Sequence, residues 1–246
     1  MIDKSIIFKI IGSLLFIEAL LLLACLFMAI GYQEDDVPAF IITIILTTLT
    51  GIVLRYLGRN ADNNMSRRDA YLVVTLSWII FSFFGTLPFI ISGYIPSFTD
   101  AYFETMSGFT TTGATIIDDV DKLPHGLLFW RSMTQWIGGL GIVFFTTAVL
   151  PSFVGGSVKV FAAESTGPIS SRLHPRLSTG AKWIWVVYLV LTIGCVLSFM
   201  ACGMGWFDSI NYAMGSTATG GFSTHTDSAE FFRSPAIEYV ATFFCF

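Results

Sequence analysis

Two short stretches rich in threonine and glycine carry the residues whose types and spacing could do chemistry. They are Thr110-Thr111-Thr112-Gly113 and Thr217-Ala218-Thr219-Gly220. Glycine adopts main-chain angles that a β-carbon forbids, so it allows successive carbonyl oxygens to line up on one axis. Such oxygens can replace the hydration shell of a monovalent cation. The pattern therefore predicts cation coordination by main-chain oxygens, with residues 111–113 and 218–220 nearest the ion.

A short helix is predicted directly before each stretch. Thr99 and Asp100 give an N-cap signal for residues 101–109, and Asp208 gives one for residues 209–216. Aligning the two glycines, Gly113 and Gly220, gives an internal repeat of 107 residues. Its parts are a long helix, a capped short helix, a Thr/Gly strand and a second long helix. A half-helix entering a membrane points its partially negative C-terminal end at the membrane centre, where it favours a cation.

The composition predicts that these elements lie in a lipid bilayer. Of the 246 residues, 54% are hydrophobic and 12% are charged, whereas soluble domains carry about 25% charged residues. The net charge of −4 argues against a nucleic-acid partner, because nucleic-acid binding calls for a basic surface.

Five apolar runs are long enough to cross a bilayer: residues 5–30, 38–57, 71–94, 127–150 and 183–204. A sixth run starts at Pro235 and is too short to cross, so we expect the last span to be incomplete in this chain. The sequence predicts an all-α polytopic membrane protein built from helix–pore loop–helix repeats. Its expected parts are a two-helix extension (1–66), a first repeat (67–152), a cytoplasmic linker (153–182) and a truncated second repeat (183–246).

The cations predict the orientation of the chain. Most of them flank one set of span ends: Lys4, Lys9, Arg55, Arg59, Arg67, Arg68, Lys159, Arg172, Arg176 and Lys182. The positive-inside rule assigns this set to the cytoplasm, so the N-terminus is expected there and both Thr/Gly stretches are expected to enter from outside. The protein is thus predicted to lie in the cytoplasmic membrane.

Several polar groups near the stretches are expected to support the pore rather than to touch the ion. They are Asp100, Glu104, Asp208, Arg131 and Gln135. Arg131 either pairs with an acid in the outer vestibule or has a functional role, as ionisable groups at membrane depth often do. Gln135 is expected to hold its helix to a pore loop. Glu18, in the middle of the first span, is expected to pack against a polar neighbour.

Two further features leave alternatives open. The run Gly138-Gly139-x-Gly141 could be a hinge, or it could let helices pack closely, which we favour. The acids Asp118, Asp119 and Asp121 could concentrate cations through their field, or they could belong to a merely solvated loop.

No pattern of enzymatic chemistry emerges from the titratable residues. The four cysteines lie inside apolar runs without ligand spacing, and the three histidines have no partners at ligand spacing. The intramembrane acids and histidines form no acid/base or nucleophile set. We therefore predict a non-enzyme without an organic cofactor, and the absence of a GxGxxG fingerprint argues against nucleotide binding by this chain.

Longer motifs resemble one known family. These motifs are SGFTTTGAT at residues 107–115, FWRSMTQWIGGLGI at 129–142 and ATGGFS at 218–223. They resemble the membrane subunits of Trk-type potassium uptake systems, within the Trk/Ktr/HKT superfamily. The likeness covers essentially the whole chain, which corresponds to the N-terminal half of such a subunit.

The resemblance implies four pore-loop repeats, similar to potassium channel subunits, around one K⁺ path. It also implies a homodimer and a cytoplasmic nucleotide-binding ring as a regulatory partner. Glycine at both filter positions favours K⁺ over Na⁺ within this family. Alternatives remain open: a Na⁺/K⁺ symporter-like transporter of the same architecture, or a membrane scaffold without transport. Whether flux is channel-like or coupled to H⁺ or Na⁺ also stays open.

Overall fold

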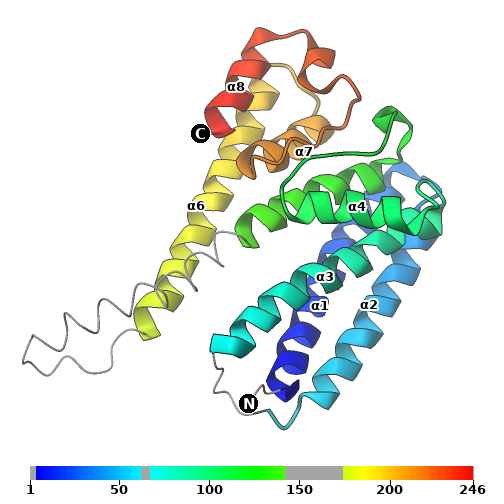
Figure 1. Cartoon of the computed structure of the whole chain (residues 1–246). Helices are drawn as coiled ribbons and strands as arrows, with labels where there is room; N and C mark the ends of the chain where they lie inside the picture. The colour runs from blue at the N-terminus through cyan, green and yellow to red at the C-terminus, as the bar shows by residue number, and fades with distance from the viewer. Residues whose placement is uncertain (1–3, 62–66, 142–173, 246) are drawn as a thin grey trace, which may run out of the picture.

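The computed structural model describes residues 4–61, 67–141 and 174–245. Within these ranges the chain is helical apart from turns, loops and short 3₁₀ helices. Figure 1 shows long helices α1, α2, α3 and α6, with the short helices α4 and α7 between the α1–α3 bundle and α8.

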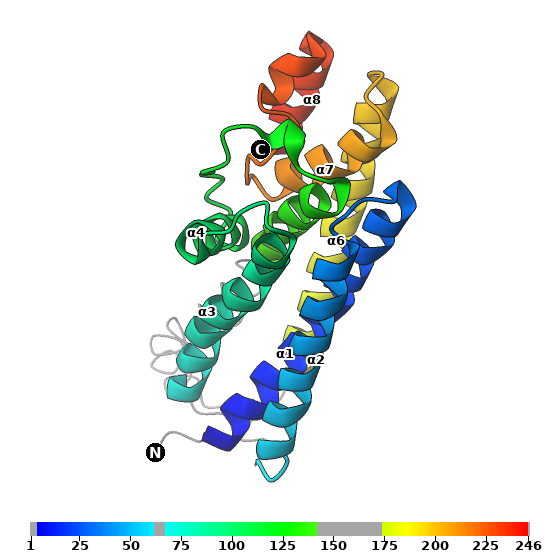
Figure 2. The ribbon, with the colours of Figure 1, turned by 90° about the vertical axis from the view of Figure 1, so that its right-hand side faces the viewer.

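Helices α1 (Lys4–Tyr32) and α2 (Val37–Leu57) form an antiparallel hairpin. Glycines set how closely the two helices approach. A β-carbon on Gly12 would lie 2.8 Å from the Gly51 carbonyl oxygen, and one on Gly58 would lie 2.5 Å from the backbone nitrogen of Lys9. Small residues permit this close packing between helices in a membrane. The hairpin lies beside α3 (Figure 2).

Helix α3 (Arg67–Ser92) positions the first short helix, α4 (Phe98–Phe109). Gly85 marks the contact, since a β-carbon there would lie 2.8 Å from the Thr105 side chain of α4. The indole N–H of Trp130 donates to the Gly85 carbonyl oxygen at 2.8 Å. A buried aromatic core including Phe109 and Trp130 therefore joins α3, α4 and the helix that follows.

That following helix, which we call the inner helix, begins after η1 (Val120–Lys122) and covers residues 125–141 of the described chain. Residues 126–135 of the inner helix are all buried. Its position at the centre of the molecule brings it into contact with both halves of the chain. Tyr188 of α6 donates a hydrogen bond to the Trp136 carbonyl oxygen at 2.9 Å, and the Trp136 indole donates to Thr192 at 3.0 Å.

The second half repeats the order of elements found in the first half. Its elements are α6 (His174–Ala201), α7 (Trp206–Thr217), η2 (Ser228–Phe232) and α8 (Pro235–Cys245). Helices α4 and α7 both have 12 residues. Each follows a long helix and precedes an irregular loop and a 3₁₀ turn.

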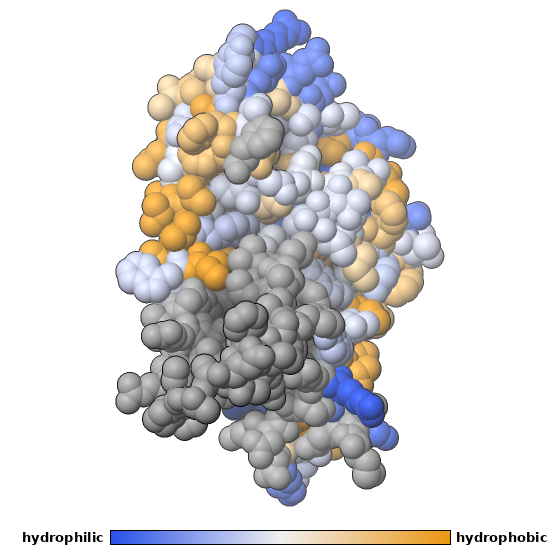
Figure 3. Space-filling view, turned by 60° about the vertical axis from the view of Figure 1, so that its left-hand side comes forward, coloured by the Kyte–Doolittle hydropathy of each residue, from blue (hydrophilic) through white to orange (hydrophobic). Residues whose placement is uncertain are grey.

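Within the described ranges, four helices are long and apolar enough to cross a membrane: α1, α2, most of α3 and the Trp183–Ala201 part of α6. The prediction of an all-α protein with several apolar membrane-spanning helices is therefore confirmed. Figure 3 shows hydrophobic side chains along the two sides of one face and hydrophilic side chains at its two ends. The predicted run 127–150 lies only partly in the described residues, and residues 153–173 of the predicted linker lie outside them.

Helix α6 begins at His174, so its first residues lie within the predicted linker 153–182; the division of the chain into four parts stays a prediction. The predicted starts of the two short helices were wrong. Helices α4 and α7 begin three residues earlier than predicted, after Ser97 and Gly205. Asp100 and Asp208 therefore lie in the first turns of these helices instead of capping them. The sequence does not distinguish the two positions, because a carboxylate stabilises a helix from the N-cap and from the first turn.

Candidate functional site

The loops after α4 and α7 start with the same backbone motif. Loop A covers residues 110–119 and loop B covers residues 218–227. In loop A, the N–H of Thr111 donates to Gly108 and that of Thr112 donates to Ser107, both at 2.9 Å. These are the two bonds of a Schellman motif, which ends a helix with one residue in the left-handed conformation.

Loop B repeats this motif with equivalent bonds. The N–H of Thr219 donates to Ser216 at 3.0 Å, and that of Gly220 donates to Gly215 at 2.8 Å. The left-handed residues are Thr111, with φ of 54°, and Thr219, with φ of 51°. Glycine is usual at this place, and a β-branched residue with positive φ is uncommon and strained. Because both loops keep threonine in this strained conformation, both positions require the threonine side chain for a reason other than stability.

The structure corrects the register of the repeat from 107 to 108 residues. Thr111 matches Thr219, and Gly113, with φ of 74°, matches Gly221, with φ of 86°. Thr217 is thus the last residue of α7, and Gly221 is the loop glycine that sequence reasoning missed. In the sequence Gly113 can be aligned with either Gly220 or Gly221, and only the backbone angles show that Gly221 is the equivalent residue.

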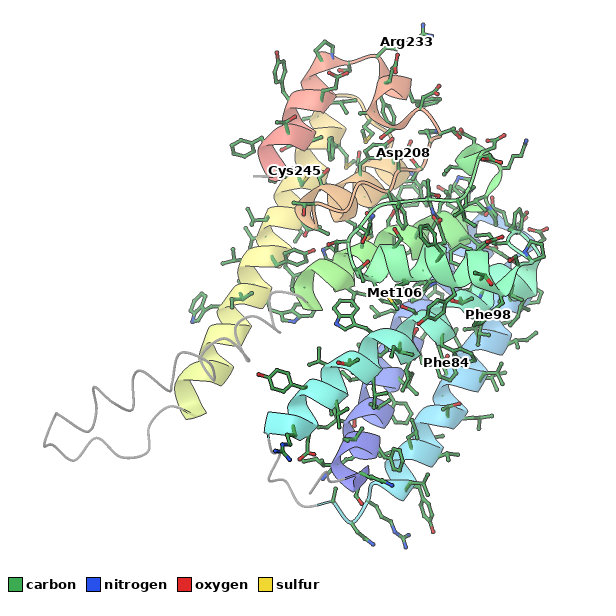
Figure 4. All side chains as sticks on the ribbon, in the orientation of Figure 1. Phe84, Phe98, Met106, Asp208, Arg233 and Cys245 are labelled. Atoms are coloured by element: carbon green, nitrogen blue, oxygen red, sulfur yellow. The ribbon has the colours of Figure 1, made fainter. Side chains whose placement is uncertain are left out.

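The main-chain oxygens at the start of each loop are unoccupied by backbone bonds. Among the described residues, no hydrogen bond ends on the carbonyls of residues 110–113 or 218–221, whereas the carbonyls of residues 106–108 and 214–216 accept backbone N–H groups. The two loops also meet, because a β-carbon on Gly113 would overlap the Gly220 carbonyl oxygen. Two segments with unpaired acceptors therefore lie together at the C-terminal ends of α4 and α7, the helices that carry Met106 and Asp208 in Figure 4.

A buried ion pair between Glu104 and Arg131 holds residues 115 and 116 of loop A. Glu104 of α4 accepts a hydrogen bond from Arg131 of the inner helix at 2.9 Å, and these side chains are 0% and 2% exposed. Glu104 also accepts from the Thr115 hydroxyl at 3.0 Å and from the Ile116 N–H at 3.1 Å. The Glu104 carboxylate thus ties Thr115 and Ile116 of loop A to α4, the short helix that precedes this loop.

Arg131 also reaches loop B. Its Nη1 donates to the Ser223 carbonyl oxygen at 3.0 Å, and its guanidinium lies 4.3 Å from the centre of the Phe222 ring. A guanidinium can make these contacts together with an ion pair because it has five donors and a planar face. Arg131 therefore pairs with an acid, as one of the two alternatives expected, but does so in a buried position that joins both loops.

Gln135 lies one turn further along the inner helix and contacts loop B. Its Oε1 accepts the N–H of Phe222 at 3.1 Å, and its amide fills the space that a β-carbon on Gly220 would occupy. The side chain is fully buried, and its Nε2 has no hydrogen-bond partner among the described residues. A β-carbon on Gly113 would lie 3.7 Å from the same Nε2, so this donor lies beside both loops.

The glycines of the inner helix allow it to pack against both loops. A β-carbon on Gly138 would overlap the Phe109 carbonyl oxygen, and one on Gly139 would lie 3.0 Å from the Ala218 β-carbon. Close packing, the favoured alternative for this motif, is therefore the role that the contacts of Gly138 and Gly139 support. Gly141 has only ordinary contacts, with Trp78 at 3.6 Å.

A histidine and an aspartate join the end of loop B to η1, the 3₁₀ turn that follows loop A. His225 Nδ1 lies 2.6 Å from Asp121, whose other oxygen accepts the Thr226 N–H at 3.0 Å. The His225 partner and the Thr226 N–H lower the pKa of Asp121 to about 2. We call this pairing the outer latch. Asp119 is likewise paired, with Lys122 at 2.8 Å, so local pairing occupies two of the three acids considered as a cation-concentrating field.

The other predicted positions differ in their surroundings. Asp208 accepts the Thr224 hydroxyl at 2.7 Å, so it holds loop B. Asp100 is exposed and makes no hydrogen bond or ion pair with the described residues, so the structure does not connect it to loop A. Glu18 is buried, and neither of its oxygens has a hydrogen-bond partner in the described ranges, contrary to the expected polar neighbour. Thr115, Phe222 and Ser223 hold the loops and were missed, since no local pattern marks them.

The tip of the N-terminal hairpin fastens the start of the inner helix. The Glu34 carboxylate accepts the backbone N–H of His125 and lies 2.7 Å from its ring nitrogen. Tyr32 stacks on the same ring with centroids 3.7 Å apart. Asp36 is buried beside Gly126, and burial together with Glu34 raises the pKa of Asp36 to about 6. Acids at a helix N-terminus stabilise that helix end.

Comparison with known proteins matches the chain to one family. The family model TrkH, described as a cation transport protein, matches residues 36–246. The Trk system potassium uptake protein TrkH of Halomonas elongata is 38% identical over 240 residues, which cover 97% of this chain and 50% of that protein. TrkH of Vibrio parahaemolyticus is 37% identical over 98% of this chain and 50% of its own length.

The crystal structure of the potassium transporter TrkH from Vibrio parahaemolyticus superposes with a TM-score of 0.85 at 35% identity. The superposition covers 99% of this chain and 49% of that one, so the chain spans about half the length of the relatives it matches. The family match, the sequence identities and the shared fold all agree: this chain belongs to the TrkH family of cation transport proteins.

Proposed function

We propose that the chain contributes two pore loops to a potassium uptake pathway, in which carbonyl oxygens of loops A and B coordinate dehydrated K⁺. One observation carries this proposal: the carbonyls of residues 110–113 and 218–221 accept no hydrogen bond among the described residues, although they lie where two helices end. Unpaired carbonyls at such a place are suited to replace the water around an ion.

The electrostatics of the site support the same proposal. The C-terminal ends of α4 and α7 lead into the loops, and a helix C-terminus carries a partial negative charge that stabilises a nearby cation. The charge of Arg131 is balanced by Glu104 at 2.9 Å, so the guanidinium adds little net repulsion. These groups position the loops, and the main-chain oxygens bind the ion.

The orientation follows from the distribution of charge along the fold. Lys4, Lys9, Arg55, Arg59 and Arg68 lie at one end of the α1–α3 bundle, which we call the basic end. The acidic residues of the hairpin tip and of the outer latch lie at the opposite end. We infer that the basic end faces the cytoplasm and that loops A and B enter from outside.

Two loops supply half of a four-fold ring, and the chain spans about half of its relatives. We propose that two further repeats complete the ring, that two such proteins form a dimer, and that a cytoplasmic nucleotide-binding ring regulates it. The relatives named above are potassium uptake proteins. Glycine in loop A at residue 113, and in loop B at residues 220 and 221, favours K⁺ as the transported ion.

The test is ion selectivity in the complete natural protein that contains this chain. Gly113→Ser places a side chain against the Gly220 carbonyl, and Gly220→Ser places one against the Gln135 amide. Both variants should lower the ratio of K⁺ to Na⁺ uptake in cells lacking other potassium uptake systems. Gly31→Ser is the matched control, because a β-carbon at Gly31 meets nothing within 4 Å. Unchanged selectivity in both loop variants, at normal protein levels, would refute the filter.

A further inference from the structure

A pocket lies at the basic end of the α1–α2 hairpin, far from loops A and B. Its volume is about 360 Å³, and it is lined by Lys9, Phe16, Ile52, Arg55, Tyr56 and Arg59. Three of these six residues are cations and none is acidic. Such a lining favours an anion.

The two arginines of the pocket are held in place by neighbours. Arg55 donates from Nη1 to the Ser13 hydroxyl at 2.9 Å, and Arg59 lies 4.4 Å from the centre of the Tyr56 ring. The partners of the two arginines in these contacts are a hydroxyl and an aromatic ring, so each guanidinium keeps N–H groups that can donate to a ligand. Arginine suits phosphate because its planar fork can donate two parallel hydrogen bonds.

The apolar lining lies deeper in the membrane than the cations. Phe16 follows Lys9 by seven residues in α1, and Ile52 lies inside α2, whereas Arg59 follows the end of that helix at Leu57. Seven helical residues rise about 10 Å, which separates the headgroup level of a lipid from its upper acyl chain. The pocket thus presents charge at one depth and hydrocarbon at the next.

The flank around the pocket is open to the bilayer. Ile52, Val53, Tyr56 and Leu57 of α2 are each more than half exposed. The close contacts at Gly12, Gly51 and Gly58 bring the two helix backbones together, so the long side chains spread around the contact and form the pocket wall. A ligand must therefore combine an anionic group with an apolar tail that lies along a membrane-facing surface.

We propose that this pocket binds an anionic phospholipid, with its phosphate between Arg55 and Arg59 and an acyl chain against Phe16 and Ile52. Basic pockets between membrane helices are suited to such headgroups. The site is separate from the ion pathway and does not depend on loops A and B acting as a filter. It would anchor the hairpin whose opposite tip holds the start of the inner helix through Glu34.

Native mass spectrometry of the complete natural protein in detergent, with added phosphatidylglycerol, tests the proposal. The double variant Arg55→Gln/Arg59→Gln should weaken lipid retention about twenty-five-fold, since each cation in contact with the lipid phosphate contributes about fivefold. Arg68→Gln is the control, because it removes one exposed cation from the same end outside the pocket. Its retention should stay within about twofold of the parent protein. Equal retention by the double variant and the parent would overturn the proposal.

Two further arms identify the ligand. Phosphatidylcholine should be retained less than phosphatidylglycerol, and soluble glycerol phosphate should not displace bound phosphatidylglycerol at equal concentration. Displacement by glycerol phosphate would show a free-phosphate site and overturn the lipid assignment, as would the absence of retained lipid in the parent protein. Normal K⁺ uptake by the double variant provides the folding control, so failure here is distinguishable from failure of the filter.

Discussion

Loops A and B begin alike and are held differently. Each leaves a 12-residue helix through a Schellman motif with threonine in the left-handed position. Loop A is then tied to its own repeat through Glu104, which binds Thr115 and Ile116. Loop B is tied largely to the other repeat, through Arg131, Gln135 and Asp121. The repeat is thus conserved in backbone geometry and asymmetric in support.

The difference also shows in exposure. Thr110 and Thr112 of loop A are exposed, whereas Ala218 and Gly220 of loop B are buried under the inner helix. The inner helix therefore serves both loops, because its Arg131 and Gln135 lie against residues of loop A and of loop B. Changes to the inner helix should affect loop B at least as strongly as loop A.

The largest effect is expected from Arg131→Met. Removing one partner of a buried ion pair leaves an unpaired charge and costs about 3 to 5 kcal/mol. Hydrogen exchange of residues 110–119 and 218–227 should accelerate together, and the thermal unfolding temperature should fall. Arg233→Met, at an exposed arginine at the end of the molecule near α8 (Figure 4), is the control. Protection of loop B that survives in Arg131→Met would show that the two loops are supported independently.

Gln135→Leu should destabilise loop B and leave loop A largely unchanged. It removes the acceptor of the Phe222 N–H, and leaving a buried donor unpaired costs about 1 to 3 kcal/mol. We expect faster amide exchange in residues 218–227 and little change in residues 110–119. The exchange of loop A is the internal control. Equal acceleration of both loops would contradict the asymmetry.

Thr111→Gly and Thr219→Gly should act alike, because both positions have left-handed angles. Each substitution should raise the free energy of unfolding by up to about 1 kcal/mol, as relief of the left-handed strain exceeds the entropy that glycine loses on folding. We also expect weaker discrimination between K⁺ and Na⁺, since the loop start becomes freer. Arg233→Gly, at another position with positive φ, should stabilise without changing selectivity.

The smallest effect concerns the outer latch. The pKa of Asp121 is lowered to about 2, so its stabilising contribution is present above the ordinary carboxyl pKa near 4 and is lost as pH falls towards 2. Asp121→Asn should accelerate exchange of the Thr226 amide at neutral pH. The difference between variant and parent should shrink below about pH 4. A difference as large at pH 2 as at neutral pH would exclude this pairing as its cause.

The sequence predicted the helices and both loops because apolar runs and the Thr/Gly motif are local signals. It did not predict that Glu104 and Arg131 bind each other, since they are 27 residues apart on different helices. Nor could it predict Arg131 bonding to Ser223, 92 residues away. The register error at Gly220 and Gly221 had a different origin: either glycine fits the motif, and only the backbone angles distinguish them.

The dependence of loop B on the first repeat matches the order of synthesis. Ribosomes add about 5 to 20 residues per second, so the 92 residues between Arg131 and Ser223 take roughly 5 to 20 s to make. In the described part of the chain, the side-chain hydrogen bonds that Glu104 and Arg131 make to each other and to loop A join residues 104–131, all of which are made before loop B emerges. The second loop can therefore be assembled on a surface that already exists, while this polar support of the first joins residues that have already been translated.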